Sequence, residues 1–567
     1  MSPINLCLSN LAHDLSQQCL AGAVLGFLSH TLYFIRGYHD QHALSIFLTH
    51  LLGSLVLLIL TSSFLAATLI TTSYLTALFT SIALYRLFFH PLRNFPGPLL
   101  AKLTRLYIPF AQQADMKMHI HQNNLFKKYN SDIIRVAPNE LYILQPSAIQ
   151  LIHGAKSGCR KRNAGVYNVV TYKGEHNLDS MLDREDHRWR RQVWERSLTT
   201  KNLTIYEVKT KETISTWLSK LAESAKSQKP IDTSLFSLLL TFENMGQVGF
   251  SHSFGSLSSG KEAPMLHYLE TLFGDIAKLG EMVWPMALVQ SLASRGIIDG
   301  GDAAKFDTLT VEMANRRMQD IEKGDEGTDM FGFFVADHKS EKPLAYDKLD
   351  TVYADAGLIL VGATDTIAVV LSYCWFYLVS SVDEQGRSYQ DRLFEEVRSV
   401  FGQTKPGEFV DSDLQKCELL EAVLSETLRL ENPVANNASR MTPKEGLMLA
   451  DGTHIPGGVS VRVPGYGLQR SEKTFVKPDD FIPERWTTKP ELVLDRLAFM
   501  PFIVGPNNCV GKRLAWMVLR LVVSYTVYHY KFQLAPGEDG KAIHEQAQNH
   551  LILSAGPLQL VFEKREN

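Results

Sequence analysis

The first 90 residues of this 567-residue chain have very little charge. They contain only four charged side chains, Asp14, Arg36, Asp40 and Arg86, whereas the remaining residues carry 113 of the 117. The six cysteines lack paired spacing and are too few for a disulfide framework in a chain of this length. A net charge of -3 argues against nucleic-acid binding, and 45% hydrophobic residues exclude intrinsic disorder. The sequence therefore divides into an apolar start and an ordinary globular remainder.

The apolar start is long enough to cross a membrane more than once. No Lys, Arg, Asp or Glu occurs from Gln41 to Tyr85, and a helix needs about 20 residues to span a bilayer core. Thr61-Ser62-Ser63 offers a break, so we expect spans near 43–61 and 65–86. A weaker apolar stretch covers 19–34, which is either a third span or an amphipathic surface helix. Asp14 stands where a cleavable signal peptide would carry basic residues.

The few cations predict how this segment is oriented. Arg36 lies between the first and second apolar stretches, and Arg86, Arg93 and Lys102 follow the third. By the positive-inside rule both regions face the cytosol, and the amino terminus and the 61–64 turn face the lumen. The following Phe95-Pro96-Gly97-Pro98 stops a helix and predicts a hinge. We therefore expect a membrane anchor over 1–90 and a globular domain over 91–567.

Helical periodicity dominates the rest of the chain, which predicts a mainly α domain with a small β portion. The pattern of Val459–Val463 predicts a strand. The charged, interrupted stretch 324–345 predicts a surface loop between helices. No internal repeat or low-complexity tract occurs. Apolar residues recur at three-to-four spacing over 203–225, 231–248, 262–278, 303–323, 346–380, 389–402, 411–431 and 512–527.

Cys509 lies in a glycine-containing loop, Pro501-Phe502-Ile503-Val504-Gly505-Pro506-Asn507-Asn508-Cys509-Val510-Gly511, directly before a helix. Amides at the start of that helix would stabilise a thiolate. A lone cysteine is usually a small buried hydrophobe, but Phe-x-x-Gly-x-Asn-x-Cys-x-Gly resembles the haem-binding loop of the cytochrome P450 superfamily. The resemblance implies a P450 fold, haem b with Cys509 as the iron ligand, and Phe502, Gly505, Asn507 and Gly511 as cofactor contacts.

Asn507 departs from the family pattern, because the family usually has Arg or His there to bind a haem propionate. Arg440 is similar to a propionate-binding arginine of the family and would compensate. His187 and Arg191 have the i, i+4 spacing at which the family places two further propionate contacts. The alternative for the nearby Arg188 and Arg190 is a solvated basic face, which could dock an acidic electron donor.

Two more segments follow the order of motifs in the family. Glu426 and Arg429 lie on one face of a helix, and Phe481-Ile482-Pro483-Glu484-Arg485-Trp486 supplies a third member, Arg485, of a structural Glu-Arg-Arg triad. Earlier, Gly362-Ala363-Thr364-Asp365-Thr366 lies in the long apolar helix 346–380. An N-cap or exposed turn would explain it in isolation. Read with the cysteine loop, it resembles the distal oxygen-binding helix, whose Asp365-Thr366 pair would be catalytic and deliver protons.

These motifs imply a membrane-anchored haem-thiolate monooxygenase that oxidises a lipophilic small molecule. No Gly-x-Gly-x-x-Gly opens a helix after a strand, so electrons from NADPH would come through a partner. NADPH-cytochrome P450 reductase, with cytochrome b5 as a possible helper, and an endoplasmic reticulum location with a cytosolic catalytic domain follow from the resemblance. The first residues and the cysteine loop look like those of fungal members that act in secondary metabolism.

We expect substrate contacts from residues 160–180, from the helix face around Leu358 and Gly362, and from the turn 434–437. The alternatives are a P450-fold isomerase or dehydratase that uses a peroxide without a reductase, and a multi-span receptor or transporter.

Overall fold

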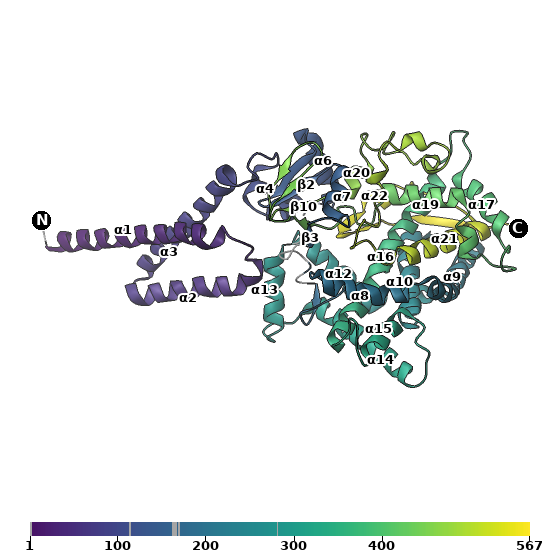
Figure 1. Ribbon diagram of the computed structural model, residues 1–567, viewed down its shortest axis with the longest axis horizontal. Coiled ribbons are helices and arrows are strands. Elements are labelled where there is room, and N and C mark those ends of the chain that lie inside the picture. Colours follow the sequence, from purple (N-terminus) through teal and green to yellow (C-terminus); the bar gives the residue numbers. More distant parts are fainter. Residues whose placement is uncertain (1–2, 113–114, 162–166, 168–169, 281, 567) are drawn as a thin grey trace.

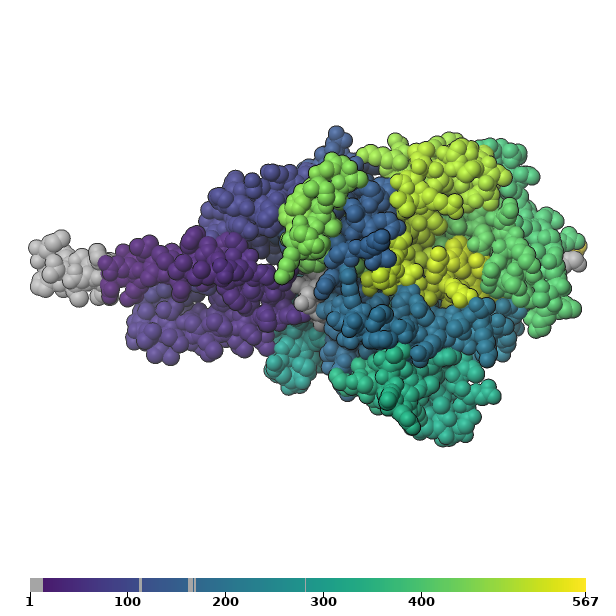
Figure 2. All heavy atoms as spheres, in the orientation of Figure 1, coloured from purple at the N-terminus to yellow at the C-terminus, as the bar shows by residue number. Residues whose placement is uncertain are grey.

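The computed structural model describes residues 3–112, 115–161, 167, 170–280 and 282–566. Three helices project from one end of a larger domain: α1 (Pro3–Ser29), α2 (Ala43–Thr61) and α3 (Phe64–Leu84) (Figures 1 and 2). A left-handed Ser62 ends α2, and the Ser63 side chain caps α3 by accepting from the Ala66 amide. The predicted break at 61–63 is therefore confirmed.

Two of these projecting helices meet the length and composition needed to cross a membrane, Asp40–Thr61 and Phe64–Phe89. A third candidate is Leu349–Ser380. Because 61% of its most apolar 18-residue stretch is buried inside the protein, it is a core helix. The weaker stretch 19–34 forms the end of α1 and the following turn His30–Phe34, and α1 is not among the candidates in the described part of the chain. Helix α1 packs along α3.

The predicted hinge at 95–98 is wrong, because this segment is fixed to the domain. The Arg135 amide donates to the Pro96 carbonyl at 2.7 Å, and the buried Arg135 guanidinium donates to the carbonyls of Arg86 and Pro138. Gly97 has a φ of +156, and a Cβ there would overlap the Arg135 carbonyl. Buried donors require partners, and Pro96 supplies the one for the Arg135 amide, which ties the segment to β1 (Ile133–Ala137).

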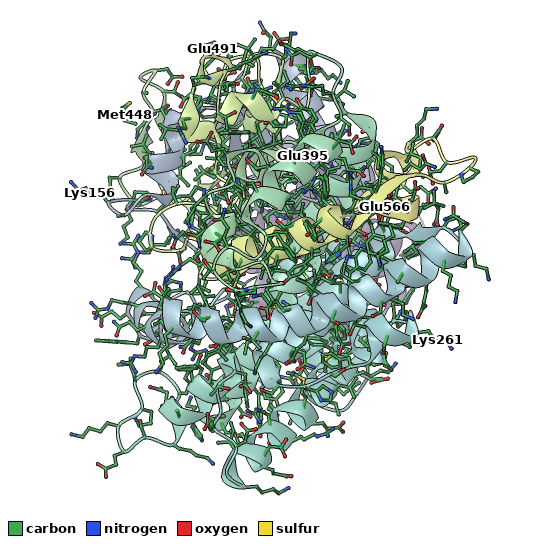
Figure 3. The ribbon with its side chains drawn as sticks, turned by 90° about the vertical axis from the view of Figure 1, so that its right-hand side faces the viewer. Lys156, Lys261, Glu395, Met448, Glu491 and Glu566 are labelled. Atoms are coloured by element: carbon green, nitrogen blue, oxygen red, sulfur yellow. The ribbon has the colours of Figure 1, made fainter. Side chains whose placement is uncertain are left out.

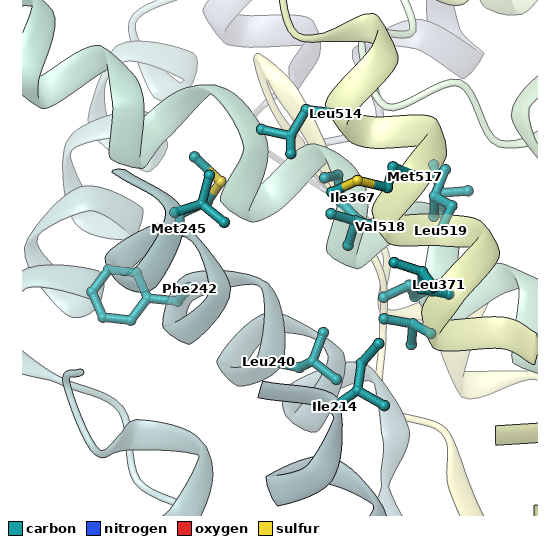
Figure 4. Close-up of a cluster of buried hydrophobic side chains, with 14 of the residues drawn as sticks. Ile214, Leu240, Phe242, Met245, Ile367, Leu371, Leu514, Met517, Val518 and Leu519 are labelled. Carbon is teal, nitrogen blue, oxygen red and sulfur yellow. The ribbon is translucent and has the colours of Figure 1, made fainter. Parts of the chain in front are cut away.

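The core of the larger domain is formed by helices α10 (Thr233–Phe250), α16 (Leu349–Ser380) and α21 (Lys512–His529). Met245, Ile367 and Leu514 come from these three helices and lie in one apolar cluster (Figure 4). Lys156, Lys261 and Glu491, by contrast, point outward at the periphery (Figure 3). The observed helices agree with the predicted mainly α class. Further helices around this core are α9 (Thr200–Ser227), α12 (Pro264–Lys278), α14 (Gly301–Glu322), α17 (Tyr389–Val400) and α19 (Glu418–Leu430).

The largest sheet among the described residues has five strands in the order β1-β2-β10-β7-β3, and smaller sheets of two or three strands accompany it. The predicted strand 459–463 is present as β10, and β3 pairs antiparallel with β7 so that Lys161 lies opposite Arg440. This pairing matters for the site, because it joins two basic residues that are far apart in the sequence. The strands are β1 (Ile133–Ala137), β2 (Glu140–Ile143), β3 (Arg160–Lys161), β7 (Arg440–Met441) and β10 (Ser460–Arg462).

Two predictions about the helical part are wrong. Residues 324–345 contain a buried helix, α15 (Met330–His338), in place of a surface loop. Asp329 caps this helix by accepting from the Gly332 amide, and it pairs with Arg317 at 2.6 Å. The charged residue that suggested a surface loop is therefore a buried helix cap. The predicted helix 411–431 is two helices, α18 (Asp411–Leu414) and α19.

Candidate functional site

Cys509 lies in a tight loop that directly precedes α21. Its amide donates to the Phe502 carbonyl at 2.9 Å, and the Asn508 amide donates to the Gly505 carbonyl at 3.0 Å. Gly505 has a φ of +77, and a Cβ there would overlap the His153 carbonyl, so glycine is required. Ile503 has a φ of +56, a conformation that β-branched residues rarely adopt. Strain of this kind is typical of functional loops.

The thiol of Cys509 faces a cavity of about 600 Å³ that is mostly apolar. Burial raises the pKa of this thiol, while the amides of Gly511 and Lys512 and the charge of Arg191 act in the opposite direction. These amides belong to the start of α21, as predicted. They are the groups that would stabilise a thiolate once the sulfur binds a metal.

Donors gather on one wall of the cavity. Lys161, His187 and Arg440 all line it, and Arg440 donates to the hydroxyl of buried Tyr167 at 3.3 Å. Burial, together with the charges of Lys161, Arg191, Arg440 and Arg190, lowers the pKa of His187 to about 3. Burial likewise lowers the pKa of Lys161 to about 8. His187 is therefore a neutral hydrogen-bond donor within a positive field, an arrangement that suits carboxylates.

Lys161 and Tyr167 were not predicted from the sequence. A single lysine or tyrosine has no spacing signal, and Lys161 joins the wall only because β3 pairs with β7. Its ammonium donates to the carbonyls of Leu178 and Asp179 and lies 5.6 Å from the centre of the Tyr167 ring. Lys161 supplies the positive charge that Asn507, which also lines the cavity, lacks.

Arg191 holds the cysteine loop. Its guanidinium donates to the Asn508 carbonyl at 2.5 Å and to Asn508 Oδ1 at 2.7 Å, and it pairs with Glu195. Arg191 also lines the cavity, but these bonds differ from the predicted contact with a propionate. The alternative of a solvated basic face is confirmed for Arg188, which is exposed. It is wrong for Arg190, which is buried and pairs with Asp355 at 3.6 Å.

Glu426, Arg429 and Arg485 come together as the sequence predicts. Arg429 donates to both oxygens of Glu426 at 2.9 Å, and Arg485 donates to Oε1 at 2.8 Å. All three side chains are fully buried. The triad joins α19 to the segment 481–486, which precedes the cysteine loop.

Helix α16 forms the wall that carries the predicted oxygen-binding motif. Gly362, Ala363 and Thr366 line the cavity together with Leu358, and the Thr366 hydroxyl donates to the Gly362 carbonyl at 3.0 Å. Asp365 does not line the cavity. Burial raises its pKa to about 7. The N-cap alternative is wrong, because the motif lies in the middle of α16.

The predicted substrate region is partly confirmed as cavity wall. Leu358, Gly362 and the turn residues Val434, Asn436 and Asn437 line it. Within 160–180, residues 162–166 and 168–169 lie outside the described residues. The others that line the cavity are Lys161, Tyr167, Val170, Thr171, Tyr172, Asn177, Leu178, Asp179 and Ser180.

These residues fit a haem, the group that the sequence resemblance implies. The Cys509 sulfur is exposed to the cavity, and donors suited to two propionates lie on one wall. A Cβ added to Gly362 would have no atom within 4 Å, so α16 leaves room at this position. Cys509 would ligate the iron, and Lys161, His187 and Arg440 would hold the propionates.

Comparisons with known proteins agree with this geometry. The Cytochrome P450 family profile matches residues 96–562. Cytochrome P450 monooxygenase orf5 of Eupenicillium brefeldianum is 32% identical over 495 residues, which cover 87% of this chain and 95% of that protein. Tryprostatin B 6-hydroxylase of Aspergillus fumigatus is 29% identical over 500 residues, or 88% of this chain and 85% of that protein.

The fold has a counterpart among solved structures. The crystal structure of the cytochrome P450DA heme domain matches with a TM-score of 0.67 at 14% identity, over 83% of this chain and 98% of that chain. The sequence matches and this shared fold lead to one assignment. The chain belongs to the cytochrome P450 family and is one of its monooxygenases.

Proposed function

We propose that this protein inserts one oxygen atom from O2 into a lipophilic small molecule of secondary metabolism, with Cys509 as the iron ligand. The observation that carries this proposal is the position of the Cys509 thiol in the same cavity as the Gly362-Ala363-Thr366 face of α16. The cavity is largely apolar, which favours a lipophilic substrate. The similarity to tryprostatin B 6-hydroxylase supports a role in secondary metabolism.

The protein's own residues would have three tasks. The amides of Gly511 and Lys512 stabilise the Cys509 thiolate, and Arg191 fixes the loop that carries it. Lys161, His187 and Arg440 would hold the propionates of a bound haem. Bound haem supplies the redox chemistry of oxygen activation and C–H oxidation.

Proton delivery is the task of Asp365 and Thr366. Because burial raises the pKa of Asp365 to about 7, this carboxyl both takes up and releases a proton near neutral pH. Thr366 is the next residue in α16 and lines the cavity. We assign Asp365 the role of holding the proton and Thr366 the role of passing it into the cavity.

Electrons would come from NADPH through a cytochrome P450 reductase, with cytochrome b5 as a second donor. Arg188 and the residues Lys512 and Arg513 at the start of α21 are exposed and basic, which suits an acidic partner. Arg36 and Arg86 lie at the ends of the apolar helices that adjoin the larger domain, which favours a cytosolic catalytic domain on the endoplasmic reticulum membrane (Figure 1).

The central test replaces Cys509, the proposed iron ligand. Cys509→Ser should abolish both product formation and the thiolate-type Soret band of the reduced CO complex, because a serine hydroxyl does not provide a thiolate. Cys19→Ser, in the projecting helix α1, serves as the control and should retain both. A Cys509→Ser protein that keeps the band would overturn the ligand assignment.

A second experiment addresses the reaction class. Membranes that contain the protein and a reductase are incubated with cell extracts, and the metabolites are compared with those from Cys509→Ser membranes. Products that carry one additional oxygen and require NADPH are expected. Rearranged or dehydrated products that form without NADPH would support the isomerase or dehydratase alternative.

A further inference from the structure

Helix α14 (Gly301–Glu322) contributes one face to the cavity. Ala303, Phe306, Asp307 and Thr310 all line it, at the i, i+3, i+4 and i+7 positions of one helical face. Two of these four residues are polar. The surrounding wall from α12 (Pro264–Lys278) is apolar, with Leu269, Leu272, Phe273 and Ile276.

The Asp307 carboxyl has no hydrogen-bond or ion-pair partner among the residues that the structure describes. Burial raises its pKa to about 6, and no neighbouring charge contributes to this change. Asp307 is half-buried, so its unpaired carboxylate keeps only part of its hydration, which costs free energy. A cationic ligand would remove that cost.

Thr310, three residues after Asp307, is 3% exposed, and its hydroxyl oxygen is covered by neighbouring atoms. Asp307 is therefore the polar group that this face of α14 presents to the cavity.

The positive groups of the cavity do not satisfy Asp307. Lys161 donates to two backbone carbonyls, and Arg440 donates to Tyr167 and to the Ser439 carbonyl. Asp307 is thus an acceptor in the cavity without a partner among the described residues, which favours a ligand with a charged donor.

We propose that Asp307 holds a protonated nitrogen of the substrate. The substrate is then a lipophilic amine whose apolar body lies against α12 and α16. This inference rests on the proposed monooxygenase function and names the class of molecule that the reaction consumes. It also makes Asp307 a residue that determines specificity.

The test uses the purified full-length protein with haem bound and measures binding by calorimetry. The probes are two soluble aryl compounds of the same shape, one ending in a trimethylammonium group and the other in a tert-butyl group. A quaternary ammonium group does not bind iron, so affinity reports on the cavity alone. The native protein should bind the cationic probe more tightly.

Asp307→Asn should weaken binding of the cationic probe about tenfold, equivalent to about 1.4 kcal/mol, and should leave binding of the neutral probe within about twofold. Asp307→Glu should keep the preference for the cation. Glu312→Gln, which removes a charge from the exposed face of the same helix, is the matched control and should change neither affinity.

Equal affinity of the native protein for the cationic and neutral probes would overturn the proposal. Equal weakening of both by Asp307→Asn would also overturn it, because Asp307 would then only shape the cavity.

Binding and oxidation are measured separately, so the two proposals can fail separately. Selective binding of the cation without NADPH-dependent oxidation would overturn the monooxygenase proposal and support the amine site. Normal oxidation of a substrate without selectivity for the cation would overturn the amine site alone.

Discussion

Arg485 donates its Nε–H to Glu426 Oε1 at 2.8 Å, although 59 residues separate them in the chain. The same carboxylate accepts from Arg429, from the Trp486 indole and from the Ile482 amide. The Arg485 guanidinium also donates to the carbonyls of Val476, Lys477 and Leu492. A single buried carboxylate therefore joins α19 to the segment that leads to the cysteine loop.

Glu426→Gln should destabilise the fold by about 3–5 kcal/mol, because two buried guanidinium groups lose the charge that compensates them. The midpoint of urea-induced unfolding and the fraction of protein that retains haem measure this effect. Glu418→Gln changes an exposed residue of the same helix and should alter neither quantity. A Glu426→Gln protein as stable as its parent would show that the carboxylate charge is dispensable.

Particular residues show how far sequence reasoning reaches. The triad and Cys509 were found because each belongs to a short motif and because these motifs follow one another in a distinctive order along the chain. The partner of Arg191 was not found, because helical spacing tells which face a residue lies on but not which loop packs there. The helix within 324–345 was missed for a related reason. The charge of Asp329 suggested solvent exposure, whereas its partners are Arg317 and a helix amide.

Arg191→Lys should loosen the cysteine loop, because a lysine ammonium does not reproduce the two parallel donors that bind Asn508. We expect faster loss of haem and a larger inactive fraction in the CO spectrum, with little change in the unfolding midpoint. Arg188→Lys, on the exposed face of the same helix, is the control. Equal haem retention in both variants would contradict the role of Arg191 in holding the loop.

Gly97→Ala should destabilise the junction between the anchor and the domain by about 3 kcal/mol, because the added Cβ overlaps the Arg135 carbonyl in addition to the backbone strain. Gly386→Ala is the control. Gly386 also has a positive φ, +75, but a Cβ there has no atom within 4 Å. Only the backbone penalty of about 1 kcal/mol applies there. Similar unfolding midpoints for the two variants would contradict a fixed junction.

Asp365→Asn should raise stability at alkaline pH while lowering product formation. Burial raises the pKa of Asp365 to about 7 in the folded protein, so the folded state binds more protons than the unfolded state from about pH 4 to pH 7. The free energy of unfolding therefore falls as pH rises through this window. The destabilisation caused by the ionised, buried Asp365 carboxylate is fully present above pH 7. At pH 8 the variant should be more stable than its parent by about 2–4 kcal/mol, and at pH 5 by about half as much.

Urea unfolding at both pH values measures this difference in stability, with the exposed Asp347→Asn as the control. A variant that is less stable at pH 8 would mean that the carboxylate has a structural partner, and unchanged product formation would remove Asp365 from proton delivery.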